Sequence, residues 1–229
     1  MINEKIIAAV ISVYQHCEVI SFPINCENLL MQYGYEVKKY SELSGRKRKA
    51  CMDLSEDATT LDGTVFYNDS KPNGRIRFSL MHELGHIVLN TDSEKDADTF
   101  SSNLLAPRMA IHYSKCKRSE DVAKTFVLSK QAAQVAFDDY IRWFYSVSTY
   151  GMTRNDKKLY THFYNEKANK FVWKSDRCKF CYNEVAYNEA SLCTQCKIFE
   201  IKKLYTPRII DDFEHNLSIA RSNWLYGNL

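Results

Sequence analysis

The stretch RFSLMHELGHIVLN, residues 77–90, constrains the fold most strongly, because it places two histidines and a glutamate inside an otherwise apolar segment. The apolar residues recur at helical spacing and predict a helix over residues 75–89. On that helix His82 and His86 are four residues apart and project from the same face. Their imidazole nitrogens can therefore reach one metal ion together.

Glu83 lies beside the first histidine in sequence but points about 100° round the helix from it. It is a poor third ligand, yet it is well placed to touch a water bound to the metal. This is the His-Glu-x-x-His arrangement of zinc peptidases. Gly85 removes a side chain where another element or a substrate must come close. The alternative interpretation is a core helix with two half-buried histidines.

A catalytic zinc usually has three protein ligands and one open position, so a third ligand must come from elsewhere. The candidates are Glu94, Asp96, Asp98 and His112. A second predicted helix, residues 94–105, must fold back close to the first because the connecting loop is short. Asp96 suits the helix cap together with Ser93, and Pro107 ends the helix. Glu94 is preferred over Asp98 as the third ligand. Asp98, one turn on, can accept the spare N–H of His82 or His86.

The rest of the first 148 residues predicts a mainly helical α+β domain with a small sheet. Further helices are expected in the first 34 residues, with Asn25 capping the second, and over 119–126 and 129–146, with Ser129 capping the last. Strands are expected at 35–40, 49–54 and 63–69. The last of these is either the edge strand of a substrate cleft or an inner strand. The basic run 46–49 is expected in a solvated loop.

Four cysteines cluster near the C-terminus, at Cys178, Cys181, Cys193 and Cys196. Two Cys-x-x-Cys pairs, each held by a tight turn, can supply four thiolates to one closed, tetrahedral structural zinc. Two disulfides or free thiols are the alternative. The predicted organisation is a metallopeptidase domain (1–148), a linker (149–158) and a zinc-ribbon-like domain with a tail helix (159–229). Strands are expected at 159–164 and 170–174.

Composition limits the function classes. The chain has 229 residues with 45% hydrophobic and 26% charged side chains, which is typical of a globular protein. The net charge of +3 is too small to imply a nucleic-acid partner by itself, although basic and aromatic residues of the C-terminal domain make nucleic acid a secondary candidate there. No apolar run approaches the roughly 18–20 residues of a membrane span, and the N-terminus lacks a signal-peptide pattern, so a cytoplasmic location is expected.

Two linked motifs resemble the ImmA/IrrE family of metallopeptidases. The family pattern has His-Glu-x-x-His, then Glu-x-x-Ala-(Asn/Asp)-x-Phe, then Leu-Leu-x-Pro. These elements occur here as HELGH (82–86), EKDADTF (94–100) and LLAP (104–107). The resemblance covers roughly residues 1–146 and is tightest over 75–107. Ser101 and Ser102 depart from the small apolar residues usual in the family.

The resemblance implies a zincin-like, intracellular zinc endopeptidase of a phage or mobile element. His82, His86 and Glu94 would hold the catalytic zinc, and Glu83 would be the general base. Family members typically cleave or otherwise inactivate a helix-turn-helix repressor. Two alternatives remain: a non-proteolytic antirepressor that displaces the repressor, and a DNA-binding regulator led by the zinc ribbon. His112, Tyr113 and Tyr67 are candidates for stabilising the oxyanion.

Overall fold

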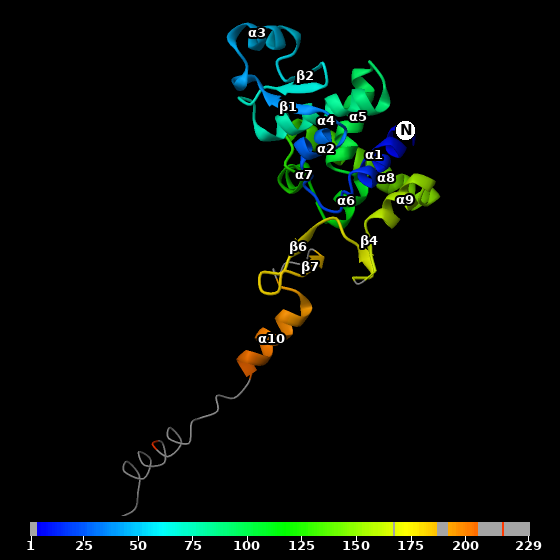
Figure 1. Ribbon diagram of the computed structural model, residues 1–229. Coiled ribbons are helices and arrows are strands. Elements are labelled where there is room, and N and C mark those ends of the chain that lie inside the picture. The colour runs from blue at the N-terminus through cyan, green and yellow to red at the C-terminus, as the bar shows by residue number, and fades with distance from the viewer. Residues whose placement is uncertain (1–3, 167, 187–191, 206–216, 218–229) are drawn as a thin grey trace, which may run out of the picture. The chain divides into compact units, whose positions relative to one another are not determined.

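The computed structural model describes residues 4–166, 168–186, 192–205 and 217 (Figure 1). The chain divides into two compact units, Met1–Asp176 and Arg177–Leu229. The sequence analysis places the linker earlier, at 149–158. Apart from residue 217, the predicted tail helix lies outside the described residues.

The first unit is mainly helical with small sheets, in agreement with the predicted fold class. Its elements are α1 (Glu4–His16), α2 (Cys26–Gln32), β1 (Glu36–Lys39), the 3-10 helix η1 (Tyr40–Glu42), α3 (Gly45–Leu54), β2 (Ala58–Leu61), β3 (Thr64–Tyr67), α4 (Asn73–Leu89), α5 (Glu94–Leu105), α6 (Arg108–Tyr113), α7 (Ser119–Phe126), α8 (Lys130–Tyr150), α9 (Arg154–His162), β4 (Tyr164–Asn165) and β5 (Lys170–Phe171). None of the helices in the described part of the chain is both long and apolar enough to cross a membrane.

Helices α4 and α5 form a tight antiparallel pair that carries both histidines. Asn90 ends α4 in the left-handed conformation (φ 47°), which turns the chain back. Ser93 then caps α5 by accepting a hydrogen bond from the Asp96 amide, as predicted. A Cβ at Gly85 would lie only 3.1 Å from Cα of Ala97 and from Cδ1 of Phe100. The glycine of the HELGH motif therefore lets the two helix backbones approach closely.

The core of this unit lies behind the helix pair. The α5 side chains Phe100, Leu104 and Leu105 are fully buried. Tyr14 of α1, also fully buried, donates its hydroxyl to the Leu104 carbonyl at 2.7 Å, near the C-terminal end of α5 where carbonyls lack helical partners. The core thereby fixes α5 from the side opposite its charged residues.

The first unit also contains a three-stranded sheet with the order β1-β3-β2, and its strands β2 and β3 contact α4. Strand β1 pairs parallel with β3, and β2 pairs antiparallel with β3 through a turn in which Asp62 and Gly63 both have positive φ. The segment 63–69 thus supplies the inner strand, not the edge. Strand β2, which the sequence analysis did not predict, is an edge strand and contacts α4.

Two local expectations were wrong. Residues 46–54, expected as a basic loop and a strand, form helix α3 because Arg, Lys, Ala, Met and Leu are good helix formers. The predicted strand at 159–164 is mostly the end of α9, which starts within the expected linker. A capping box between Thr153 and Asp156 begins α9, and Trp143 of α8 donates its indole N–H to the same aspartate at 2.9 Å.

Candidate metal centre

The cluster of possible ligands comes from the α4–α5 pair. His82 and His86 lie on successive turns of α4, and Glu94 is the first residue of α5. The two Nε2 atoms are 3.0 Å apart, and the Glu94 carboxylate oxygens lie 3.0 Å from Nε2 of His82 and 3.5 Å from Nε2 of His86. The short turn after α4 therefore brings together the three residues that the sequence analysis selected as ligands.

Two hydrogen bonds fix the histidine tautomers. Nδ1 of His86 lies 2.7 Å from the carbonyl oxygen of Thr91, which can only accept, so Nδ1 carries the proton. Nδ1 of His82 lies 2.9 Å from Oδ1 of Asp98, where a carboxylate likewise accepts. Both Nε2 atoms then present lone pairs to the space between the helices. Such outer hydrogen bonds orient ligand histidines.

The donor set fits zinc. Two imidazole lone pairs and a carboxylate converge with all ligand atoms within 4.8 Å of one another. Ligands at 2.0–2.1 Å in a tetrahedron are about 3.3 Å apart, close to the distances between these atoms. A cation between the three groups would attract each of them. The Glu94 side chain is 78% exposed, whereas the histidines are mostly covered, so the site faces solvent on the α5 side.

Glu83 is held apart from the ligands by a residue of the sheet. Thr60 of the edge strand β2 donates its hydroxyl to Oε2 of Glu83 at 2.5 Å. One carboxylate oxygen is thereby occupied, and the other can accept a proton. The sequence contains no local signal for this contact, because β2 lies 23 residues before Glu83 in the chain. The Thr91 carbonyl was missed for a different reason: a backbone group carries no residue signature.

The proposed oxyanion-stabilising residues make their contacts elsewhere. The Tyr67 hydroxyl donates to Glu27 at 3.0 Å, and His112 lies 3.4 Å from the Tyr140 hydroxyl. Tyr113 stacks on Phe171 with ring centroids 4.6 Å apart. These contacts engage each side chain outside the histidine–glutamate cluster, so none is supported as an oxyanion donor.

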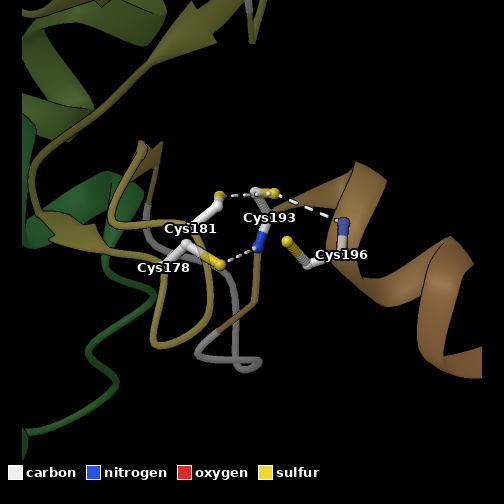
Figure 2. Close-up of side chains that lie close together, drawn as sticks. All are labelled: Cys178, Cys181, Cys193 and Cys196. Atoms are coloured by element: carbon white, nitrogen blue, oxygen red, sulfur yellow. Dashed lines mark hydrogen bonds between the residues drawn. The ribbon is translucent and has the colours of Figure 1, made fainter.

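The second unit holds the four clustered cysteines. Figure 2 shows Cys178 and Cys181 on one loop, facing Cys193 and Cys196, with all four sulfur atoms turned toward one another. The sulfurs of Cys181 and Cys193 are 3.6 Å apart, far beyond a disulfide bond and close to the roughly 3.8 Å expected for sulfurs at 2.3 Å in a tetrahedron. The cluster therefore also fits a metal ion.

The two Cys-x-x-Cys pairs lie in different local structures. Strands β6 (Ser175–Arg177) and β7 (Glu184–Ala186) pair around the first Cys-x-x-Cys turn, where the Tyr182 amide donates to the Cys178 carbonyl at 2.9 Å. The second pair was expected in a similar turn. It lies instead at the start of helix α10 (Thr194–Tyr205), where the Cys196 amide donates to the Cys193 sulfur at 3.4 Å.

Backbone amides favour the thiolate form of one cysteine in this cluster, Cys178. Hydrogen bonds from the backbone of Cys181, and then of Cys193, lower the pKa of the Cys178 thiol to about 6. The pKa of the Cys196 thiol is raised, first by its side-chain hydrogen bond with Cys193. The thiols of Cys178 and Cys196 therefore hold their protons with different strength. Metal binding requires thiolates and releases these protons.

Comparison with known proteins identifies the region that carries the histidines. Residues 46–149 match the model of the family described as the IrrE N-terminal-like domain, Peptidase_M78. Comparisons with curated proteins and with solved structures gave no match. The matched range runs from α3 to α8 and contains the HELGH motif, Glu94 and Asp98, whereas the cysteine cluster lies outside it. Residues 46–149 of this chain are therefore similar to the IrrE N-terminal-like domain, a domain of the metallopeptidase type.

Proposed function

We propose that the chain is a cytoplasmic zinc endopeptidase that cleaves a helix-turn-helix repressor and thereby induces genes of a phage or mobile element. The observation that carries the peptidase assignment is the convergence of two imidazole Nε2 atoms and the Glu94 carboxylate, with Glu83 bound separately by Thr60. Binding alone does not need a general base, so this arrangement favours hydrolysis over displacement. The repressor as target rests on the family resemblance.

Zinc held by His82, His86 and Glu94 would supply a Lewis acid that polarises a peptide carbonyl and acidifies water. Glu83 accepts the proton of the attacking water as the oxygen bonds to the carbonyl carbon. Glu83 then delivers this proton to the leaving nitrogen as the C–N bond breaks, giving a carboxylic acid and an amine. Thr60 keeps the carboxylate in one orientation through both transfers.

The edge strand β2 offers a binding mode for the substrate. It carries Thr60 and contacts α4, and among the described residues the order β1-β3-β2 leaves one side of β2 without a paired strand. An extended peptide could add to this edge through main-chain hydrogen bonds. Its scissile bond would then pass close to Glu83.

The test is co-expression with the helix-turn-helix protein encoded beside this chain. Wild type and Glu83→Gln are compared with the control Glu120→Gln, which makes the same change at an exposed residue of α7. We expect repressor fragments with wild type and the control, and none with Glu83→Gln. Equal derepression by all three without fragments would instead support a non-proteolytic antirepressor.

Metal analysis tests the proposed catalytic and structural zinc ions separately. We expect two zinc ions per chain after purification without chelator. His82→Ala should lose one ion, and Cys178→Ser should lose the other, because the two donor sets share no residue. A DNA gel shift that survives His82→Ala but not Cys193→Ser would favour the zinc-ribbon regulator instead.

A further inference from the structure

We propose that helix α3 is a binding surface for the phosphate backbone of double-stranded DNA. The helix carries Arg46, Lys47, Arg48 and Lys49 in succession, and Figure 1 shows it beside β2. The proposal concerns the first unit alone and does not rest on peptide hydrolysis.

The four cations are exposed and unneutralised. Cys51 is the only buried residue of α3, and the other nine are exposed. Within the described part of the chain, none of the four cations makes an ion pair. The helix has a single acidic residue, Asp53, although the whole chain carries a net charge of only +3. A dense positive charge therefore projects into solvent from a chain that is otherwise nearly balanced.

The arrangement of the cations around the helix favours binding in a nucleic-acid groove over binding to a flat protein surface. Successive helical residues are about 100° apart, so four consecutive cations spread over about 300° of the helix circumference. A flat acidic protein surface could meet only part of that arc. The major groove of B-DNA is about 12 Å wide, admits one α-helix, and is bordered by phosphates on both sides. The major groove of double-stranded RNA is too narrow for this fit.

Helix stability does not explain these cations. Positive charges in the first turn oppose the helix dipole, where acidic residues would be favourable. Helix α3 has no acidic residue in its first turn, and its N-cap Ser44 makes no side-chain capping bond. Neutralising the cations should therefore leave the fold at least as stable, which separates a binding role from a structural one.

The location of α3 relates DNA binding to the proposed peptidase site. Helix α3 contacts β2, the strand whose Thr60 holds Glu83. DNA bound to α3 would lie next to the proposed substrate strand. If the proposed peptidase function holds, a repressor could then be engaged while it is bound to its operator.

The test is fluorescence anisotropy of a labelled 20-base-pair duplex of arbitrary sequence, titrated with the full zinc-loaded chain at 50 and 200 mM NaCl. Contact with about four phosphates should weaken wild-type binding on the order of 100-fold between these salts. The variant with residues 46–49 all changed to Gln should bind at least about tenfold more weakly at 50 mM, with a salt slope reduced by about three to four. Melting curves check that it is folded, and Arg48→Glu with Lys49→Glu serves as a second variant.

The matched control changes Lys115, Lys117, Arg118 and Lys124 to Gln, which removes the same charge from exposed positions between α6 and the end of α7. It should keep wild-type affinity and salt slope. Unchanged binding by both α3 variants, or an equal loss in the control, would overturn the proposal. So would tighter binding of a labelled polyglutamate peptide than of the duplex, since that result would identify an acidic protein segment as the partner.

Discussion

Replacing Asp98 with alanine should weaken zinc binding at the histidine centre without changing the fold. The Asp98 carboxylate accepts a hydrogen bond from Nδ1 of His82, with 2.9 Å between Nδ1 and Oδ1, and so keeps Nε2 directed at the ligand cluster. Loss of such an outer partner typically lowers metal affinity 10–100-fold. Because the Asp98 side chain is 58% exposed, water can replace part of the interaction. We therefore expect about a tenfold loss, or about 1.4 kcal/mol.

Competition against a chromophoric zinc chelator measures this loss, and the cysteine cluster provides an internal reference that should not change. Asp96→Ala is the matched control, because it removes the same charge from α5 two residues earlier. Asp98→Asn retains an acceptor and should lie between wild type and alanine. The reasoning is refuted if Asp98→Ala binds zinc as tightly as wild type, or if Asp96→Ala weakens binding equally, since the effect would then be one of overall charge.

Three further perturbations test the architecture. A Cβ at Gly74 would lie 2.6 Å from backbone atoms at the α7–α8 junction, so Gly74→Ala should lower the free energy of unfolding by about 1–3 kcal/mol. Gly45→Ala is the control, because a Cβ there would meet no atom within 4 Å, and it should leave the free energy of unfolding unchanged. Chemical denaturation measures both variants. Arg75 hydrogen-bonds Asp57 and lowers the pKa of its carboxyl, so this pair stabilises the fold above the unfolded-state pKa. The stability difference between wild type and Asp57→Asn should shrink as pH falls below about 4. Asn90 has positive φ, so Asn90→Gly should keep wild-type zinc affinity while Asn90→Val, measured in the same competition assay, should lose it.

The helices that carry the centre could be predicted from sequence because their signals are local. Helix α5 begins and ends where Ser93 and Pro107 indicate, and α7 also has the predicted bounds. Asn25 and Ser129 accept the expected capping hydrogen bonds at α2 and α8. The capping residue, the apolar residues and the terminating residue of each helix lie close together in sequence. A short segment of sequence therefore contains all the signals that predict the helix.

The incorrect predictions concern segments whose structure depends on contacts with distant parts of the chain. The segment 49–54, which was expected to be a strand, lies in helix α3 and buries only Cys51. Strand β2 has little sequence signal of its own and forms because the Asp62–Gly63 turn folds it onto β3. Sheet order depends on such pairings between segments. The sequence therefore left open whether 63–69 was an inner or an edge strand.

The candidate metal centre likewise combines local and distant contributions from the sequence. The ligands follow from a motif on one helix and the start of the next, but the groups that orient them lie in the turn and on the sheet. The left-handed Asn90 presents the Thr91 carbonyl to His86, and Thr60 holds Glu83 from β2. Metal affinity should therefore depend mainly on the α4–α5 turn, whereas proton transfer should depend on the position of β2. If the proposed peptidase function holds, a partner or substrate that binds along β2 should change the rate of hydrolysis through Thr60 while the proposed metal ligands stay in place.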